Sequence, residues 1–186
     1  LSEIIGSQAY EVTITTFHGF AHSIIQKYPE DFPRIIGSVN LTEADQVQIM
    51  EKVISEAKNL KILRPFGDPY HYLGDILHAI QELKREGITP DDLEVIVAHE
   101  AKELTSRDDL YHEKGAHKGK MKGAHKDFEK QIEKNRDLAM LYAAYQDALT
   151  EQKLYDFDDM IMEVLAAMKG NADLLLQLQE QYQYVL

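Results

Sequence analysis

The sequence predicts a mainly helical protein of about six to seven helices, with short strands near both ends. Three observations predict this fold. Apolar residues recur every three or four positions through most of the 186-residue chain, which is the spacing of one helix face. Strong helix-start signals stand at Thr42 and Thr89. β-Branched and aromatic residues gather at 11–15 and 182–186, which is typical of strands.

The first half of the chain reads as a strand followed by three helices. A helix is expected after Thr16, with Pro29 just past its end and with an apolar stripe of Phe17, Phe20, Ala21, Ile24, Ile25 and Tyr28. The second helix begins with Thr42 as N-cap and Asp45 three residues later. Residues 59–69 form a connector rich in helix breakers. The third helix is expected over about 70–86, with Gly87 at the position just past its end.

The second half is expected to hold the remaining helices and one loop. Thr89 precedes Pro90 and two aspartates, which is a strong helix-start pattern. Residues 106–126 have three glycines and no helical period, so they are expected to form an exposed loop. Further helices are expected over about 127–152, from Asp156 to Gly170, and after Asn171 as a cap.

Composition limits the class of protein. The chain has no cysteine, no long apolar run and no secretory leader pattern, which favours a cytoplasmic protein with no membrane contact. Its formal charge of −12 argues against binding nucleic acid over its whole surface. The charge is segregated, however. Residues 111–126 hold five lysines against one glutamate, about +4, which leaves about −16 for the rest.

Residues 16–19, Thr-Phe-His-Gly, form the segment where structure and chemistry meet. They would follow the carboxyl end of the strand and open the helix, which is where α/β proteins bind ligands. Free N–H groups there favour a phosphate, the Thr16 hydroxyl can donate to it, and His18 can donate or stack on a base. Gly19 leaves room for close approach. The alternative is that Thr16 only caps the helix and His18 is an ordinary half-buried residue.

The two ends of the chain resemble a known family. Thr16-Phe-His-Gly-Phe-Ala-His-Ser-Ile-Ile25 is similar to a motif segment of the UvrD/Rep/PcrA family of superfamily-one DNA helicases. Leu154-Tyr-Asp-Phe-Asp-Asp-Met-Ile161, followed by Tyr184-Val-Leu186, resembles the segment that leads into that family's Walker B strand. Lys84-Arg-Glu-Gly-Ile-Thr-Pro-Asp-Asp92 is similar to a helix junction of its domain 1B.

The resemblance implies an internal part of an ATP-dependent helicase that moves 3′ to 5′ on single-stranded DNA and unwinds duplex. Residues 1–16 would end a RecA-like strand region, 17–170 would form a 1B-like helical domain with a mobile loop at about 106–126, and 171–186 would return to the RecA-like domain. The DNA-contacting residues implied are Thr16, Phe17, His18 and Gly19. The single strand, the strand–duplex junction and the remaining helicase domains would be the partners.

The lysine loop has two interpretations. Domain 1B lies near the strand–duplex junction in the family, so Lys118, Lys120 and Lys122 are candidate phosphate contacts, and such contacts weaken as salt rises. The alternative is a solvated surface segment without a ligand. ATP and Mg²⁺ are expected to bind elsewhere in the parent, because the sequence holds neither Gly-x-x-x-x-Gly-Lys-Ser/Thr nor Asp-Glu-x-Gln. No cofactor, metal or catalytic residue is therefore expected in the 186 residues, and ATP hydrolysis is not expected from them alone.

Other candidates favour structural roles. His112, His117 and His125 have no spacing that places them on one helix face, so no metal site is expected. Three aspartates at 156, 158 and 159 are interpreted as helix-start residues. Tyrosines 142, 145, 182 and 184 fit packing positions. A different class of function also stays open: an acidic, all-helical module that binds a protein partner through its amphipathic faces.

Overall fold

Two groups of helices, each with its own core, make up the computed structural model, which describes residues 13–107, 109–112, 114 and 117–184. Unit 1 comprises Leu1–Ser38 and Phe157–Leu186, and unit 2 comprises Val39–Asp156. The described residues form eight α-helices and only two very short strands, so the mainly helical prediction is confirmed. The domain boundaries expected after residues 16 and 170 stay a prediction.

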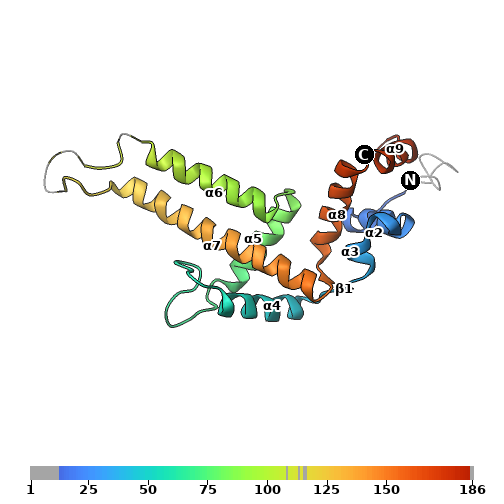
Figure 1. Cartoon of the computed structure of the whole chain (residues 1–186), viewed down its shortest axis with the longest axis horizontal. Coiled ribbons are helices and arrows are strands. Elements are labelled where there is room, and N and C mark those ends of the chain that lie inside the picture. The colour runs from blue at the N-terminus through green and yellow to red at the C-terminus, as the bar shows by residue number, and fades with distance from the viewer. Residues whose placement is uncertain (1–12, 108, 113, 115–116, 185–186) are drawn as a thin grey trace, which may run out of the picture. The chain divides into compact units, whose positions relative to one another are not determined.

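The elements follow the order shown in Figure 1. In unit 1 they are α2 (Phe17–Lys27), the 3₁₀ turn η2 (Pro29–Asp31), α3 (Pro33–Ile36), α8 (Phe157–Gly170) and α9 (Ala172–Gln181). In unit 2 they are β1 (Val39–Asn40), α4 (Glu43–Glu56), α5 (Leu73–Arg85), α6 (Pro90–Thr105), α7 (Gly123–Glu151) and β2 (Leu154–Tyr155). No helix in these described ranges is long and apolar enough to span a bilayer.

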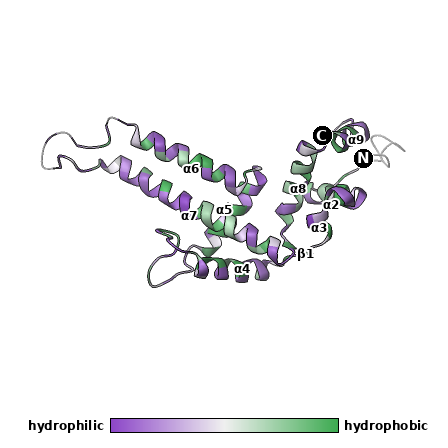
Figure 2. Ribbon diagram, in the orientation of Figure 1, coloured by the Kyte–Doolittle hydropathy of each residue, from purple (hydrophilic) through white to green (hydrophobic). Residues whose placement is uncertain are grey.

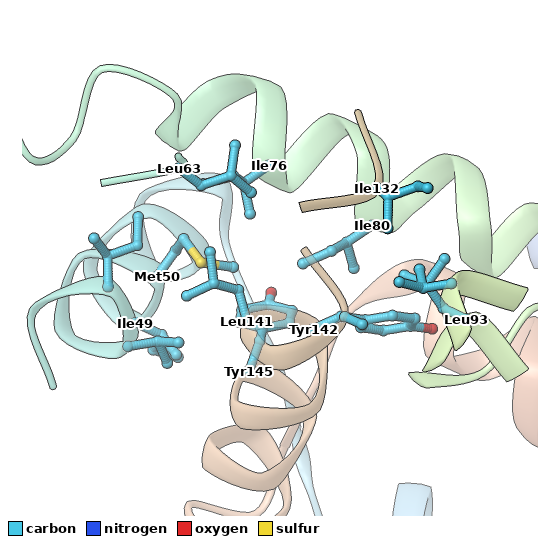
Figure 3. Packing of buried hydrophobic residues seen from close by; sticks show 14 of the residues in the cluster. Ile49, Met50, Leu63, Ile76, Ile80, Leu93, Ile132, Leu141, Tyr142 and Tyr145 are labelled. Atoms are coloured by element: carbon cyan, nitrogen blue, oxygen red, sulfur yellow. The ribbon is translucent and has the colours of Figure 1, made fainter. Parts of the chain in front are cut away.

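Helix α7 is the centre of unit 2, with α6 packed along it and α4 packed against it. Its Leu141, Tyr142 and Tyr145 are almost wholly buried; Leu141 lies on the side of Met50 of α4, and the Tyr142 ring points toward Leu93 of α6 (Figure 3). The Tyr142 hydroxyl donates to the Ile88 carbonyl at 3.1 Å, so its polar end is satisfied inside the core. The packing positions predicted for tyrosines 142 and 145 are confirmed.

The predicted helix starts in unit 2 are confirmed as capping boxes. Thr42 Oγ1 accepts from the Asp45 amide, while the Asp45 carboxylate accepts from the Thr42 amide. Thr89 and Asp92 make the same reciprocal pair at α6. Gly87 has φ +70°, a left-handed conformation that suits glycine after a helix.

Unit 1 is a small helical group in which α2 packs on α8, and α8 on α9. Their apolar faces turn inward, and the alternation of apolar and polar residues along each helix is visible in Figure 2. Its most buried apolar side chains are Ala21, Ile24, Ile25, Phe32, Ile35, Met160, Val164, Leu174 and Leu178. Asn171 caps α9 as predicted, by accepting from the amides of Asp173 and Leu174.

The strands differ from the prediction. Residues 13–15 and 182–184 form no strand, and residues 11, 12, 185 and 186 of the two predicted strands lie outside the described residues. A strand needs a hydrogen-bonded neighbour, and these described residues pair with none. Instead, β1 and β2 pair in parallel, with Val39 opposite Leu154, and join the two ends of unit 2.

The loop after α6 is shorter and better packed than expected. Helix α7 begins at Gly123, four residues before the expected start. Tyr111 and Met121 form an isolated antiparallel bridge, and Leu110 is buried at 7% exposure. Most of the described loop side chains are exposed, as predicted.

Candidate nucleic-acid interface

The start of α2 is fixed by Thr16. Its backbone is extended, and its hydroxyl oxygen accepts a hydrogen bond from the Gly19 amide at 3.1 Å. Thr16 is thus an N-cap, and because its hydroxyl accepts with a lone pair, the O–H remains able to donate outward. A Cβ at Gly19 would collide with the Thr15 hydroxyl, so a larger residue here would require the Thr15 side chain to move.

Three rings lie around this helix start. Phe17 is 83% exposed, although the helical period placed it in the buried stripe, so that part of the prediction is wrong. The His18 ring meets the edge of Phe157, with centroids 5.9 Å apart and planes at 86°. Phe157, at the first position of α8, is 52% exposed. The sequence pattern gives no sign of Phe157 at this site, because only the packing of α2 on α8 brings residue 157 beside residue 18.

Carboxylates of α8 lie beneath the rings. Asp158 Oδ1 is 3.5 Å from His18 Nε2, and Asp158 is buried at 7% exposure. The fully buried Asp159 pairs with Arg34 of α3 at 3.3 Å, and Arg34 also contacts Glu163 at 2.8 Å. Burial opposes the charge of Arg34, but these two carboxylates outweigh it and raise the pKa of the guanidinium above its usual value.

The interpretation of the three aspartates as helix-start residues alone was therefore incomplete, because all three are buried and two of them are held by cations from other elements. Asp156 lies 2.6 Å from Lys84 Nζ in unit 2, with side-chain exposures of 4% and 0%. The Lys84 ammonium also lies 5.5 Å from the centre of the Tyr145 ring. A signal existed in the sequence: Lys84 stands four residues after Ile80 and eight after Ile76, on the apolar face of α5.

The lysine loop lies in unit 2, whereas Thr16, Phe17, His18 and Gly19 lie in unit 1. Lys118 and Lys120 are exposed, and Lys122 Nζ is 3.8 Å from Asp109 Oδ2. The same Asp109 oxygen is 3.2 Å from Nε2 of His125, and this hydrogen bond is the main reason that the pKa of Asp109 is lowered. His125 is buried in the first turn of α7 and therefore anchors the loop rather than extending from it.

The histidines give no clear metal geometry. The rings of His112 and His117 lie 5.9 Å apart between centroids. Within the described ranges, no group of three or more histidine, aspartate or glutamate side chains is arranged to hold a metal ion.

Comparison with known proteins decides the family. The model of the UvrD/REP helicase N-terminal domain matches residues 1–186. The chain belongs to this family. It is also 25% identical over 185 residues to the ATP-dependent DNA helicase PcrA of Staphylococcus aureus, in strains Mu50, NCTC 8325 and COL alike. The alignment covers 100% of the chain and 20% of each relative, so the chain spans about a fifth of their length.

For this UvrD/REP family member, the start of α2 offers three means of contact. It has amide groups at the beginning of an 11-residue helix, a hydroxyl at Thr16, and exposed aromatic faces at Phe17 and Phe157. The Asp158 carboxylate lies next to His18 at this surface. The arrangement is suited to binding a ligand that has both flat rings and hydrogen-bond acceptors.

Proposed function

We propose that the chain is part of an ATP-dependent DNA helicase and that the start of α2 contacts single-stranded DNA. Membership of the UvrD/REP family supports the first part, together with the similarity to the PcrA helicases. The observation that carries the second is the exposure of Phe17 and Phe157 beside His18, at the first positions of two helices that pack on each other.

The surface favours bases over phosphates near His18. Stacking on an aromatic ring suits every base, because each has a flat π-face. Asp158 Oδ1 is 3.5 Å from His18 Nε2, so a carboxylate rather than a cation lies next to the ring at that point. We therefore assign stacking to Phe17 and Phe157, and phosphate contact to the Thr16 hydroxyl and the amides of the first turn. The His18 ring lies against Phe157, and its Nε2 is 3.5 Å from Asp158 Oδ1.

Within the 17–170 domain expected from the sequence, the helical unit 2 is proposed to be the core of a domain 1B insertion, and residues 1–16 and 171–186 are proposed to belong to the RecA-like domain 1A of the parent. The short parallel pairing of β1 and β2 supports this, because it brings the entry and exit of the insertion together. Lys118, Lys120 and Lys122 are proposed to contact phosphates at a strand–duplex junction. ATP and Mg²⁺ are proposed to bind to other parts of the parent.

Anisotropy of a labelled thymidine oligonucleotide tests the proposal. Phe17→Ala and Phe157→Ala are each expected to weaken binding at least about fivefold, which is the low end of the contribution of one stacked base. Leu176→Ala is the matched control, because Leu176 is a 55% exposed apolar residue of α9 in the same unit. Neutralising the three loop lysines should flatten the dependence of affinity on salt.

Equal affinities for all these variants would contradict the proposal. Indifference to every change, with a flat salt response, would favour the acidic protein-interaction module instead.

A further inference from the structure

One phenylalanine of unit 2 stands wholly in solvent. Phe66 is 107% exposed, at the tip of a loop between α4 and α5 that we name the Phe66 loop, residues 64–69. A single exposed apolar side chain is ordinary. The Phe66 loop is unusual because the chain on both sides of it is restrained, by buried polar contacts before the tip and by a proline on each side.

Asp137 of α7 fixes the chain before the loop. Its carboxylate is 2% exposed and accepts hydrogen bonds from three consecutive amides. These are the amides of Lys61 at 2.9 Å, Ile62 at 2.6 Å and Leu63 at 3.0 Å. Leu63 is also buried at 2% exposure. A buried carboxylate with three charge-assisted bonds holds this backbone in one conformation.

Arg64 fixes the first residue of the loop to the end of α4. Its NH1 donates to the carbonyls of Ile54 at 3.0 Å and Ala57 at 2.8 Å, which are groups that a helix end leaves unpaired. Pro65 and Pro69 restrict the backbone on each side of the tip. Several strong contacts therefore hold a turn whose central side chain packs on nothing.

The surroundings of Phe66 indicate the chemistry of a partner. The ring lies along an open, shallow part of the surface together with Arg64, Pro65, Gly67 and Pro69. Residues 58–72 carry Lys58, Lys61 and Arg64 against Asp68. Their formal net charge is +2, whereas that of the whole chain is −12. Glu133 of α7 offsets Lys61, since their charged atoms are 2.6 Å apart. An exposed ring on a restrained backbone, with Lys58 and Arg64 on the same segment, suits a stacked base next to a phosphate.

We infer that the Phe66 loop is a second nucleic-acid contact, at which Phe66 stacks on an unpaired base. The inference takes its class of ligand from the proposed function but rests on different residues in a different unit. A single ring between prolines offers little area for a protein partner, which needs a broad apolar patch. The fixed backbone lowers the entropy lost on binding, because only the ring itself must be ordered.

Fluorescence of a Phe66→Trp variant tests the inference directly. The chain contains no tryptophan, so this variant carries a single reporter. Titration with a short thymidine oligonucleotide should quench its emission at the concentrations at which DNA binds. Val95→Trp is the matched control, because Val95 is 69% exposed on α6 of the same unit, and its emission should not change. Unchanged emission of the Phe66→Trp variant at saturating DNA, or equal quenching of both variants, would overturn the inference.

Two further variants separate stacking from apolar contact and from the α2 site. Phe66→Ala and Phe66→Leu should weaken binding equally, by about fivefold or more, because neither keeps a ring. If Phe66→Leu keeps the affinity that Phe66→Ala loses, stacking is overturned, because an apolar contact without a ring is then sufficient. When Phe17→Ala is combined with Phe66→Trp, the indole should still be quenched at higher DNA concentration. Loss of affinity on Phe17→Ala with no quenching of the Phe66→Trp indole would remove the inference and leave the proposed function intact.

Discussion

Replacement of Lys84 by methionine should destabilise unit 2 strongly. The Lys84 and Asp156 side chains are 0% and 4% exposed, and their charged atoms are 2.6 Å apart. Methionine removes the cation, keeps most of the volume and leaves the Asp156 carboxylate buried beside an apolar chain. Removal of one partner from a buried ion pair costs about 3–5 kcal/mol. That is at least about a fifth of the total stability of a typical domain, about 5–15 kcal/mol.

Equilibrium urea unfolding, with hydrogen exchange of the α5 amides as the local readout, measures this cost. Arg85→Met is the matched control: it is the next residue of α5, its side chain is 53% exposed and it pairs with Glu82 on the surface. An exposed pair of that kind contributes less than about 1 kcal/mol. The double variant Lys84→Met/Asp156→Leu should recover much of the loss, because no charge is then left buried. A cost for Lys84→Met no larger than that for Arg85→Met would refute the reasoning.

Three further changes follow from single contacts. Asp137→Ala should cost about 3 kcal/mol, because three amides before the Phe66 loop lose their acceptor, and exchange of those amides should quicken. Thr89→Ala should cost about 1 kcal/mol in urea unfolding by removing the cap of α6, and Thr89→Ser should restore it. The hydrogen bond from Lys61 lowers the pKa of Glu133, so its stabilisation is present above the ordinary glutamate range and is lost as pH falls through the lowered pKa. The unfolding free energy of Glu133→Gln should therefore fall less steeply as pH is lowered than that of the unchanged protein. Equal slopes of unfolding free energy against pH for the two proteins would contradict this.

The local features of the fold were predictable because their causes are local. A threonine with an aspartate three residues later forms a capping box whatever surrounds it, and both Thr42 and Thr89 do so. Gly87 and Asn171 end and begin helices for the same kind of reason. The strands expected near both ends do not form among the described residues, because a strand needs a hydrogen-bonded neighbour and these residues pair with none.

The buried charges were missed because their partners are distant in sequence. Lys84 and Asp156 are 72 positions apart, and Asp137 lies 74 positions from Leu63. The pattern around Asp156 is equally typical of a surface helix start, so only tertiary packing distinguishes the two. For the candidate site, the sequence identified Thr16, Phe17, His18 and Gly19, whereas Phe157 joined them only when α8 packed on α2.

Photo-crosslinking most directly tests the claim that unit 1 contacts single-stranded DNA. A thymidine oligonucleotide that carries a photoreactive base would be irradiated with the chain, and the joined peptides would be mapped by mass spectrometry. Crosslinks at Phe17 or Phe157 that decrease with unlabelled competitor are the predicted result. Specific crosslinks confined to other surfaces, with both of these residues unmodified, would contradict the account.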